Sequence, residues 1–262
     1  MRLALGLEYA GDAFCGWQSQ PSRCGVADAV AKALGEIAAH PVSVHGAGRT
    51  DAGVHATSQV AHFDTQSVRP QTAWVRGVNA LLPSGAAVLW ATPVADDFNA
   101  RRNATARHYT YLLLPRAQRP ALLARRAGWY HHPLDVVAMR AGAAHLAGRH
   151  DFSAFRAAEC QARSPVRTLM HIDVTSDQTM IRFDFSADAF LQHMVRNIVG
   201  ALVYVGAGRK PPQWIAELLA SRDRTRGAPT FAPEGLYMTG ADYDPVHGLP
   251  RTRRGVVMPI ET

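Results

Sequence analysis

The order of predicted strands and helices constrains the fold of this 262-residue chain more than any other feature. In the first hundred residues, apolar side chains alternate along Leu3–Tyr9 and then follow helical spacing from Val26 to Ile37. The same patterns predict strands at 42–45 and 59–63, a helix at 74–82 ended by Pro83, and a strand at 88–92. The order β-α-β-β-α-β predicts a mixed α+β fold in which helices pack on a sheet.

The second part of the chain repeats this theme. Its patterns predict strands at 109–113, 170–174, 181–185 and 236–241 and helices at 134–146, 190–205 and 211–220. Met170, Ile172 and Val174 are expected to share one strand face, because side chains alternate along a strand. We therefore predict an α+β protein of two similar β-α-β-β-α-β-like halves, 1–103 and 104–262, that form one extended, mostly antiparallel sheet, with 236–241 closing it.

The charge of the chain is concentrated in the second half. Residues 1–103 hold 8 Lys+Arg and 8 Asp+Glu, whereas residues 104–262 hold 20 and 13 and therefore carry the whole formal net charge of +7. All but two of the 28 cationic residues are arginine. Arginine binds phosphate with a planar fork of donors and stacks on bases, so this half suits nucleic acid. A GC-rich genome, which favours arginine and alanine codons, is the alternative explanation.

Three cysteines, Cys15, Cys24 and Cys160, are an odd number without CxxC spacing. This count argues against a disulfide framework and against a zinc site. Cys15 is either a small, partly buried thiol or a nucleophile. The sequence also has no GxxxxGK[ST] loop, no HExxH motif and no apolar run near 18 residues, so a phosphate loop, a zinc-protease site and a transmembrane helix are not expected.

The run GAGRTDAGVHA, residues 46–56, places an arginine, a threonine and an aspartate between glycines. Glycine allows unusual backbone angles and the close approach of another molecule. Asp51 in such a turn, two residues from Arg49, is either a nucleophile with a charge partner or simply a turn aspartate. The run begins like the dinucleotide motif GxGxxG, but its sixth position is Asp51, so that motif is not present.

This run resembles the signature of the tRNA pseudouridine synthase A family. Five more segments resemble family motifs in the family's order and span nearly the whole chain: YAGDAFCGWQSQ (9–20), DDFNARRNATARHYTY (96–111), DFSAFRAAECQARSPVRTLMHIDV (151–174), HMVRNIVG (193–200) and EGLYMTGADY (234–243). One departure is Ala10, where the family usually has aspartate. We expect that difference to act locally, without loss of chemistry.

The resemblance implies a reaction in which uridine in tRNA becomes pseudouridine without any cofactor. The bond from C1′ to N1 breaks, the uracil turns, and a bond from C1′ to C5 forms. Asp51 matches the family's catalytic aspartate, which as a nucleophile can add to C6 of uracil or to C1′ of ribose. Arg196 matches the arginine that pairs with this aspartate and keeps it ionised. Without the motif, Arg196 is a solvated surface arginine near the apolar arc of its helix.

The resemblance also assigns residues to the substrate. Tyr109 matches the tyrosine that stacks on the target uracil, although Tyr111 lies on the same strand face and either can be a core residue. Leu236 matches an apolar residue of the pocket wall, with ordinary sheet packing as the alternative. Arg49 is the candidate to occupy or brace the space that a flipped nucleotide leaves, with pairing to Asp51 or phosphate as the alternative.

The family's substrate is the anticodon stem-loop of tRNA, at positions 38, 39 and 40, and its members work as homodimers. The resemblance therefore implies a cytoplasmic, homodimeric isomerase with tRNA as partner and with no metal and no membrane association. The arginines within matched segments that we expect near RNA are Arg107, Arg156, Arg163 and Arg167. The alternatives are a pseudouridine synthase acting on another RNA, or a non-catalytic RNA-binding module.

Overall fold

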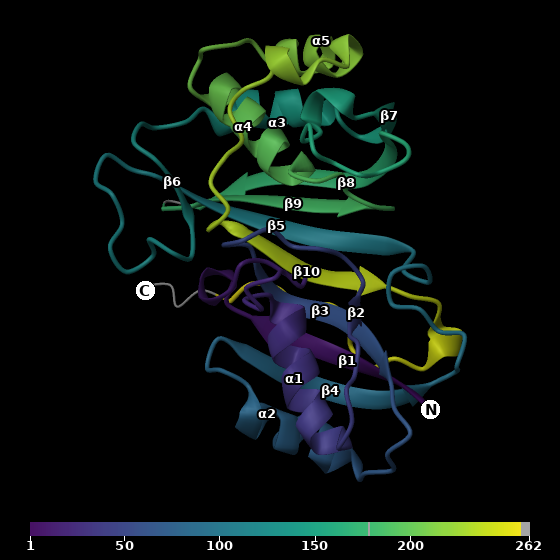
Figure 1. Ribbon diagram of the computed structural model, residues 1–262. Coiled ribbons are helices and arrows are strands. Elements are labelled where there is room, and N and C mark those ends of the chain that lie inside the picture. The colour runs from purple at the N-terminus through teal and green to yellow at the C-terminus, as the bar shows by residue number, and fades with distance from the viewer. Residues whose placement is uncertain (178, 258–262) are drawn as a thin grey trace. The chain divides into compact units, whose positions relative to one another are not determined.

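The computed structural model describes residues 1–177 and 179–257 (Figure 1). Within it the chain forms two compact units. The first unit contains Met1–Arg107 together with the chain from Tyr237 on, and the second contains His108–Leu236. The chain from Tyr237 on thus groups with the first unit, whereas the sequence pattern suggests a division at 103/104 with this strand in the second half.

Ten strands and five α-helices are described, together with short helical turns. The strands are β1 (Arg2–Tyr9), β2 (His45–Gly46), β3 (His55–Asp64), β4 (Ala86–Val94), β5 (Ala106–Pro115), β6 (Gly128–Tyr130), β7 (Gly148–Asp151), β8 (Val166–Ser176), β9 (Ile181–Ala187) and β10 (Leu236–Asp242). The α-helices are α1 (Val26–Ala38), α2 (Val78–Leu81), α3 (Val136–Ala144), α4 (Met194–Gly206) and α5 (Trp214–Ser221). A π-helical turn at Ala73–Gly77 runs directly into α2.

In the first unit the strands lie in the order β4-β1-β3-β10. Strand β1 is antiparallel to both neighbours, with Leu5 opposite Ala61 of β3 and Ala91 of β4. Helix α1 lies over these strands (Figure 1) and buries Val30 and Leu34 fully. A fully buried leucine or valine contributes about 1.5–3 kcal/mol, so this face anchors the helix to the sheet.

The predicted order β-α-β-β-α-β is confirmed in this unit, but two details of it are wrong. Residues 42–44 are not a strand, and only His45–Gly46 pairs with β3. The predicted closing strand forms as β10, but it lies inside the strand order and not at its end, next to β3 and parallel to it, with Tyr237 opposite His55. Strand β2 pairs with the later part of β3, at Ala61 and His62, and β10 pairs with its start, at His55 and Ala56. Apolar alternation indicates a strand without naming its neighbour.

In the second unit the strands lie in the order β5-β9-β8-β7, with β6 parallel to β5. Helix α3 packs on β8 and on α4, and α5 packs on α3. Asp135 caps α3, because its carboxylate accepts the Ala138 N–H at 2.9 Å. Together the units confirm the predicted α+β class, in which helices cover mostly antiparallel sheet.

The predicted apolar face of β8 is wrong at Met170. The register between β8 and β9 shifts between Leu169 and His171, so Met170 lies in an irregularity and is 54% exposed. Val174 is fully buried, as predicted for that face, and Leu169 is fully buried in place of Met170. An extra residue in one strand turns the following side chains to the opposite face, and simple alternation cannot locate it.

The cysteine expectation is also corrected, because Cys15 and Cys24 form a disulfide with Cα atoms 5.4 Å apart. Cys160 is buried and free. The odd count had suggested three thiols, but the two ends of a ten-residue loop return to the same place. The Cys15 N–H donates to the Cys24 carbonyl at 3.0 Å, which brings the two side chains together.

Reduction of this disulfide should lower the free energy of unfolding by about 2–3 kcal/mol, because closure of a short loop restricts the unfolded chain. Denaturant unfolding with and without reductant measures the difference. The double variant Cys15→Ser/Cys24→Ser should show no response to reductant. Protein denatured without reductant should titrate one thiol; titration of all three cysteines would contradict the disulfide.

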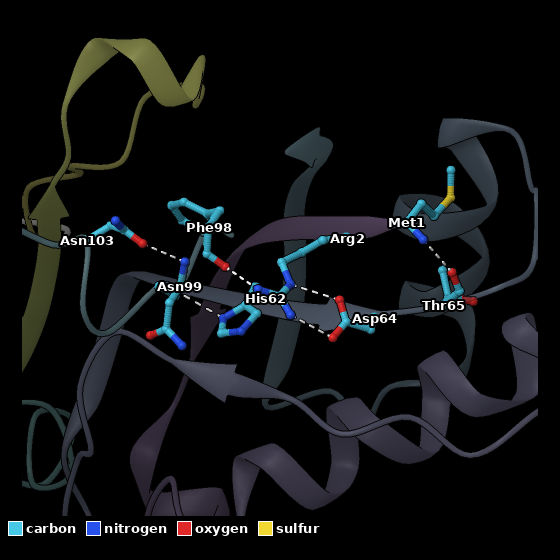
Figure 2. A network of polar contacts seen from close by, with 9 residues as sticks. Met1, Arg2, His62, Asp64, Thr65, Phe98, Asn99 and Asn103 are labelled. Atoms are coloured by element: carbon cyan, nitrogen blue, oxygen red, sulfur yellow. Dashed lines mark hydrogen bonds and ion pairs between the residues drawn. The ribbon is translucent and has the colours of Figure 1, made fainter. Parts of the chain in front are cut away.

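A network of polar contacts links β1 and β3 to the segment 98–100 in the first unit (Figure 2). Arg2 donates two hydrogen bonds to the Asp64 carboxylate, both at 2.8 Å, and a third to the Phe98 carbonyl at 2.7 Å. The Ala100 N–H donates to Nδ1 of His62 at 3.2 Å, so the ring proton of His62 sits on Nε2. Burial, with the charge of Arg2 second, lowers the pKa of His62 to about 4.

Acid should therefore destabilise the first unit through His62. An unfolded histidine takes up a proton below about pH 6.5, whereas folded His62 resists it until about pH 4. Stability from this residue is thus complete above pH 6.5 and is lost as pH falls toward 4. We expect His62 to cost the wild type about 2–3 kcal/mol of unfolding free energy between pH 7 and 4.5. Urea unfolding across this range should show that loss, and His62→Gln should remove this part of the pH dependence; an unchanged dependence would contradict it.

Candidate active site

Asp51 lies in a tight turn of the glycine-rich loop, residues 46–56, and is half-buried. The Asp51 carbonyl accepts the Val54 N–H at 3.1 Å, and Gly53 has a φ of +82°. A positive φ at the third position of a turn favours glycine, which explains the order Asp-Ala-Gly-Val. The turn fixes the backbone on both sides of the Asp51 carboxylate.

A second loop, residues 10–17, packs its backbone directly against this turn. The Trp17 N–H donates to the Thr50 carbonyl at 2.9 Å, and the Gly53 N–H donates to the Gly11 carbonyl at 3.2 Å. A Cβ on Gly11 would lie 2.1 Å from the Val54 carbonyl oxygen. Glycine is therefore required by the close approach, and the loop holds the turn of Asp51 from one side.

Buried side chains of β1 and β3 form hydrogen bonds to the glycine-rich loop. The Tyr9 hydroxyl is 2.9 Å from Oγ1 of Thr50, and Nε2 of Gln59 donates to the Gly48 carbonyl at 2.7 Å. Burial raises the pKa of Tyr9 to about 12, so its phenol stays neutral at physiological pH. These bonds come from β1 and β3, so the central strands of the unit position the residues next to Asp51.

Arg49 is exposed on the same loop, two residues before Asp51. Arg107 donates to the Ala47 carbonyl at 3.3 Å through Nη2 and to the Ala104 carbonyl at 2.9 Å through Nη1. The exposed Arg49 is available to a large ligand. Arg107 instead ties the start of the loop to the beginning of β5.

Tyr109 and Tyr111 both belong to β5 and have different surroundings in the second unit. Tyr109 is a buried residue with 8% of its surface exposed, and its ring contacts Phe190 edge-on, with ring centroids 5.0 Å apart. Tyr111 is fully buried, and its hydroxyl donates to the Ala232 carbonyl at 2.9 Å. Tyr111 is thus a core residue, which leaves Tyr109 as the tyrosine of this face that retains exposed surface.

Arg196 extends from the first turns of α4 and is half-buried. Its Nε donates to the Phe231 carbonyl at 2.8 Å, and the Phe231 N–H donates to the Arg196 carbonyl at 3.3 Å. Burial raises the pKa of Tyr111 well above its ordinary value, the charge of Glu234 raises it further, and the charge of Arg196 opposes that rise. The guanidinium is therefore oriented by one carbonyl and lies near the phenol of Tyr111.

The segment 231–235 connects Arg196 with the end of the second unit. It begins at the Phe231 carbonyl that binds Arg196 and ends at Gly235, whose carbonyl accepts the Leu112 N–H at 2.9 Å. Leu236 follows at once and is 5% exposed. Tyr109 on β5, Arg196 on α4 and Leu236 after this segment therefore all belong to the second unit. The segment is hydrogen-bonded both to Arg196 and to β5.

The other arginines of the sequence prediction mostly bind carbonyls of their own neighbourhood. Arg156 donates to the carbonyls of Cys160 and Ala162, and Arg167 donates to those of Ser164 and Val166. Arg163 is exposed. Arg156 and Arg167 thus shape the loop between them, and Arg163 presents its charge to solvent.

Across residues 1–177 and 179–257, no three His, Cys, Asp or Glu side chains are placed to hold a metal ion. In the same part of the chain, no helix has the length and apolar character needed to span a bilayer.

Residues 7–101 and 143–244 match the family model described as tRNA pseudouridine synthase. The match includes the glycine-rich loop with Asp51 as well as Arg196 and Leu236. This chain belongs to the tRNA pseudouridine synthase family. Tyr109 lies between the two matched ranges, so its assignment rests on β5 and on the motif around it.

Curated relatives in this family match along nearly their whole length. The tRNA pseudouridine synthase A of Methylobacillus flagellatus is 59% identical over 97% of this chain and 97% of its own. The enzyme of the same name from Chromobacterium violaceum is 59% identical over 95% and 96%. Among solved structures, an archaeal box H/ACA sRNP Nop10–Cbf5 complex matches at a TM-score of 0.37 and 12% identity, covering 90% of this chain and 47% of that one.

Residues that position the site in this family member were missed by sequence reasoning. Gln59 binds the glycine-rich loop, and His55 accepts the Gly11 N–H on Nδ1 at 3.0 Å. His55 begins β3 at the end of the loop and Gln59 follows on the same strand, but polar residues inside a strand give no signal of what they bind. Ala10, which replaces the family's usual aspartate, leaves the following short turn without a side-chain cap, and the turn still forms.

Proposed function

We propose that this chain is a tRNA pseudouridine synthase that isomerises uridine to pseudouridine with Asp51 as nucleophile. The observation that carries the proposal is the glycine-rich loop, which the family match includes and which hydrogen bonds from β1, β3 and a second loop hold in place. A rigid turn places the carboxylate without further ordering when substrate binds. The reaction breaks the bond from C1′ to N1 and forms one from C1′ to C5, with no net redox change.

The remaining site residues have complementary roles in the proposal. Arg196 pairs with Asp51 and keeps it ionised, because a carboxylate beside a guanidinium favours its charged form. Tyr109 stacks on the uracil and holds the ring face while the base turns in its plane. Leu236 forms an apolar pocket wall, and Arg49 braces the space that the flipped nucleotide leaves.

The proposed substrate is the anticodon stem-loop of tRNA, at uridines 38, 39 and 40. The relatives named tRNA pseudouridine synthase A support tRNA as the partner. The excess of arginine after residue 103 supports a long contact with phosphates, since cationic side chains release counterions from RNA. We propose further that the protein is a cytoplasmic homodimer and that it needs no cofactor.

Purified protein incubated with an unmodified tRNA transcript should produce pseudouridine at uridines 38–40, mapped by carbodiimide modification and primer extension. A transcript with cytidine at these positions is the matched control and should show no modification. If wild-type protein left all uridines unmodified while a control enzyme was active, the proposal would fail.

Two other outcomes separate the alternatives. Modification of uridines elsewhere, or only in another RNA, would indicate a pseudouridine synthase of different specificity. Tight tRNA binding without any pseudouridine, at all enzyme concentrations, would indicate a non-catalytic RNA-binding module.

A further inference from the structure

A cavity of about 440 Å³ lies in the second unit, outside the site residues named above. Its lining comes from the start of α4, from the loop after Phe155 and from residues 224–230. The side chains with hydrogen-bonding groups in its wall are Glu159, His193, Arg224, Thr225 and Thr230. The remaining lining residues are alanine, glycine and proline, whose small side chains leave space in the cavity. The donor groups of Arg224 and the threonines suit a ligand with several acceptor atoms.

Arg224 is half-buried in this wall without an acidic partner. Its Nη2 donates to Oδ1 of Asn197 at 3.0 Å and to Oγ1 of Thr230 at 3.2 Å, and both acceptors are neutral. Within residues 1–177 and 179–257 no carboxylate forms an ion pair with it. Burial lowers the pKa of Arg224, which reflects a charge removed from water without an anion nearby. A guanidinium placed in this way is suited to an anionic ligand.

The geometry of Arg224 is fixed before any ligand arrives. Nδ2 of buried Asn197 donates to the Phe155 carbonyl at 2.8 Å, which turns Oδ1 of Asn197 toward Arg224. Thr230 donates to the same Oδ1 at 2.7 Å. The bonds hold one face of the guanidinium, while its Nε and Nη1 make no hydrogen bond within the described residues. Fixed donors bind an anion with little loss of side-chain entropy.

The cavity lies beside Arg196 in the fold of the second unit. His193 lines the cavity and directly precedes α4, and Asn197, which binds Arg224, directly follows Arg196 on that helix. On the other wall, Thr230 directly precedes Phe231, whose carbonyl binds Arg196. His193 also has a φ of +61°, a conformation that costs a non-glycine residue about 1–2 kcal/mol and that concentrates at ligand sites.

We infer that this cavity binds a backbone phosphate of RNA next to the target uridine, with Arg224 as its main donor. The inference rests on the proposed function, because the RNA is the proposed substrate. A phosphate offers the acceptor oxygens that the free N–H groups of Arg224 lack. The exposed carboxylate of Glu159 in the cavity wall repels an anion. Its removal therefore gives a second test of phosphate binding.

The test is RNA binding with phosphates neutralised one at a time. An anticodon stem-loop is made as a series in which a single methylphosphonate replaces each phosphate near the target, and its Kd is measured for each protein. With wild-type protein, a methylphosphonate at one position should raise Kd about tenfold, which corresponds to the lower end of the energy range for a hydrogen bond to a charged group. Arg224→Met should weaken binding of the unmodified RNA about tenfold and should lose the further effect at that position.

Controls separate a ligand role from a structural one. Arg224→Lys should retain part of the affinity, and Arg149→Met, an exposed arginine of β7 in the same unit, should bind like wild type. Arg224→Met should also reduce the slope of log Kd against log salt by about 0.7–0.9, which the loss of a phosphate contact produces. An affinity loss equal at all positions, with unchanged salt slope, would overturn the inference.

Glu159→Gln supplies a change of opposite sign. It should strengthen binding of the unmodified RNA, because it removes a negative charge from the cavity wall. Weaker binding would overturn the inference and would indicate that the cavity holds a hydrogen-bond donor instead. Conversion of the same RNA by wild-type enzyme tests the proposed function separately, since binding is measured without turnover.

Discussion

Asp51→Asn should abolish pseudouridine formation and leave tRNA affinity within about threefold of wild type. Asparagine keeps the size of the side chain and the hydrogen bonds of the turn, which are made by the backbone of residue 51. It cannot form the covalent intermediate as a carboxylate does, and loss of a nucleophile costs at least about a thousandfold in rate. The measurement is single-turnover pseudouridine formation in tRNA, with affinity determined by filter binding.

A matched control is Asp97→Asn, which removes an exposed carboxylate from the same unit. It should react at the wild-type rate. Turnover by Asp51→Asn equal to that of Asp97→Asn would remove Asp51 from its proposed role and return it to a turn residue. Loss of tRNA binding in parallel with activity would show that the glycine-rich loop had unfolded.

Arg196→Met should lower the rate of the chemical step about a hundredfold while tRNA affinity changes little. Methionine retains the apolar stem of arginine and removes the charge that the proposal pairs with Asp51. Removal of one group that stabilises charge at a reacting centre typically raises the barrier by about 2.7–4 kcal/mol, which is about a hundredfold or more in rate. Single-turnover rates at saturating enzyme separate this effect from binding.

The contact between Arg196 and the Phe231 carbonyl makes a second variant useful. Arg196→Lys keeps the charge but loses the fork that donates to Phe231 and to another acceptor together. It should recover part of the lost rate. Equal losses of rate and affinity in both variants would mark Arg196 as a structural or phosphate-binding residue.

The sequence predicted the elements of the first unit well because its apolar periods are long and regular. Strands β1 and β3 and helix α1 form where alternation or helical spacing runs through many residues. What periodicity could not predict is pairing between distant segments. The placement of β10 beside β3 and the disulfide from Cys15 to Cys24 both depend on how the chain returns on itself.

The motifs in the sequence revealed the candidate site residues. They did not reveal the neighbouring residues that hold those site residues in place. Gly46 and Gly53 near Asp51 could be interpreted from the sequence, because Gly46 permits the close approach of Trp17 and Gly53 permits the turn. Gln59, which binds the Gly48 carbonyl, looks from the sequence like any polar residue in a strand. Arg224 looks like a surface arginine, and only its neutral partners Asn197 and Thr230 distinguish it.

Release of tritium from C5 of uridine tests the central claim most directly. When the bond from C1′ to C5 forms, the hydrogen at C5 is lost to solvent, so each uridine converted releases one label. With tRNA carrying [5-³H]uridine, wild-type protein should release the label of the uridines at 38–40, and Asp51→Asn should release none. Absence of release by wild type, or equal release from a tRNA with cytidine at 38–40, would contradict the account.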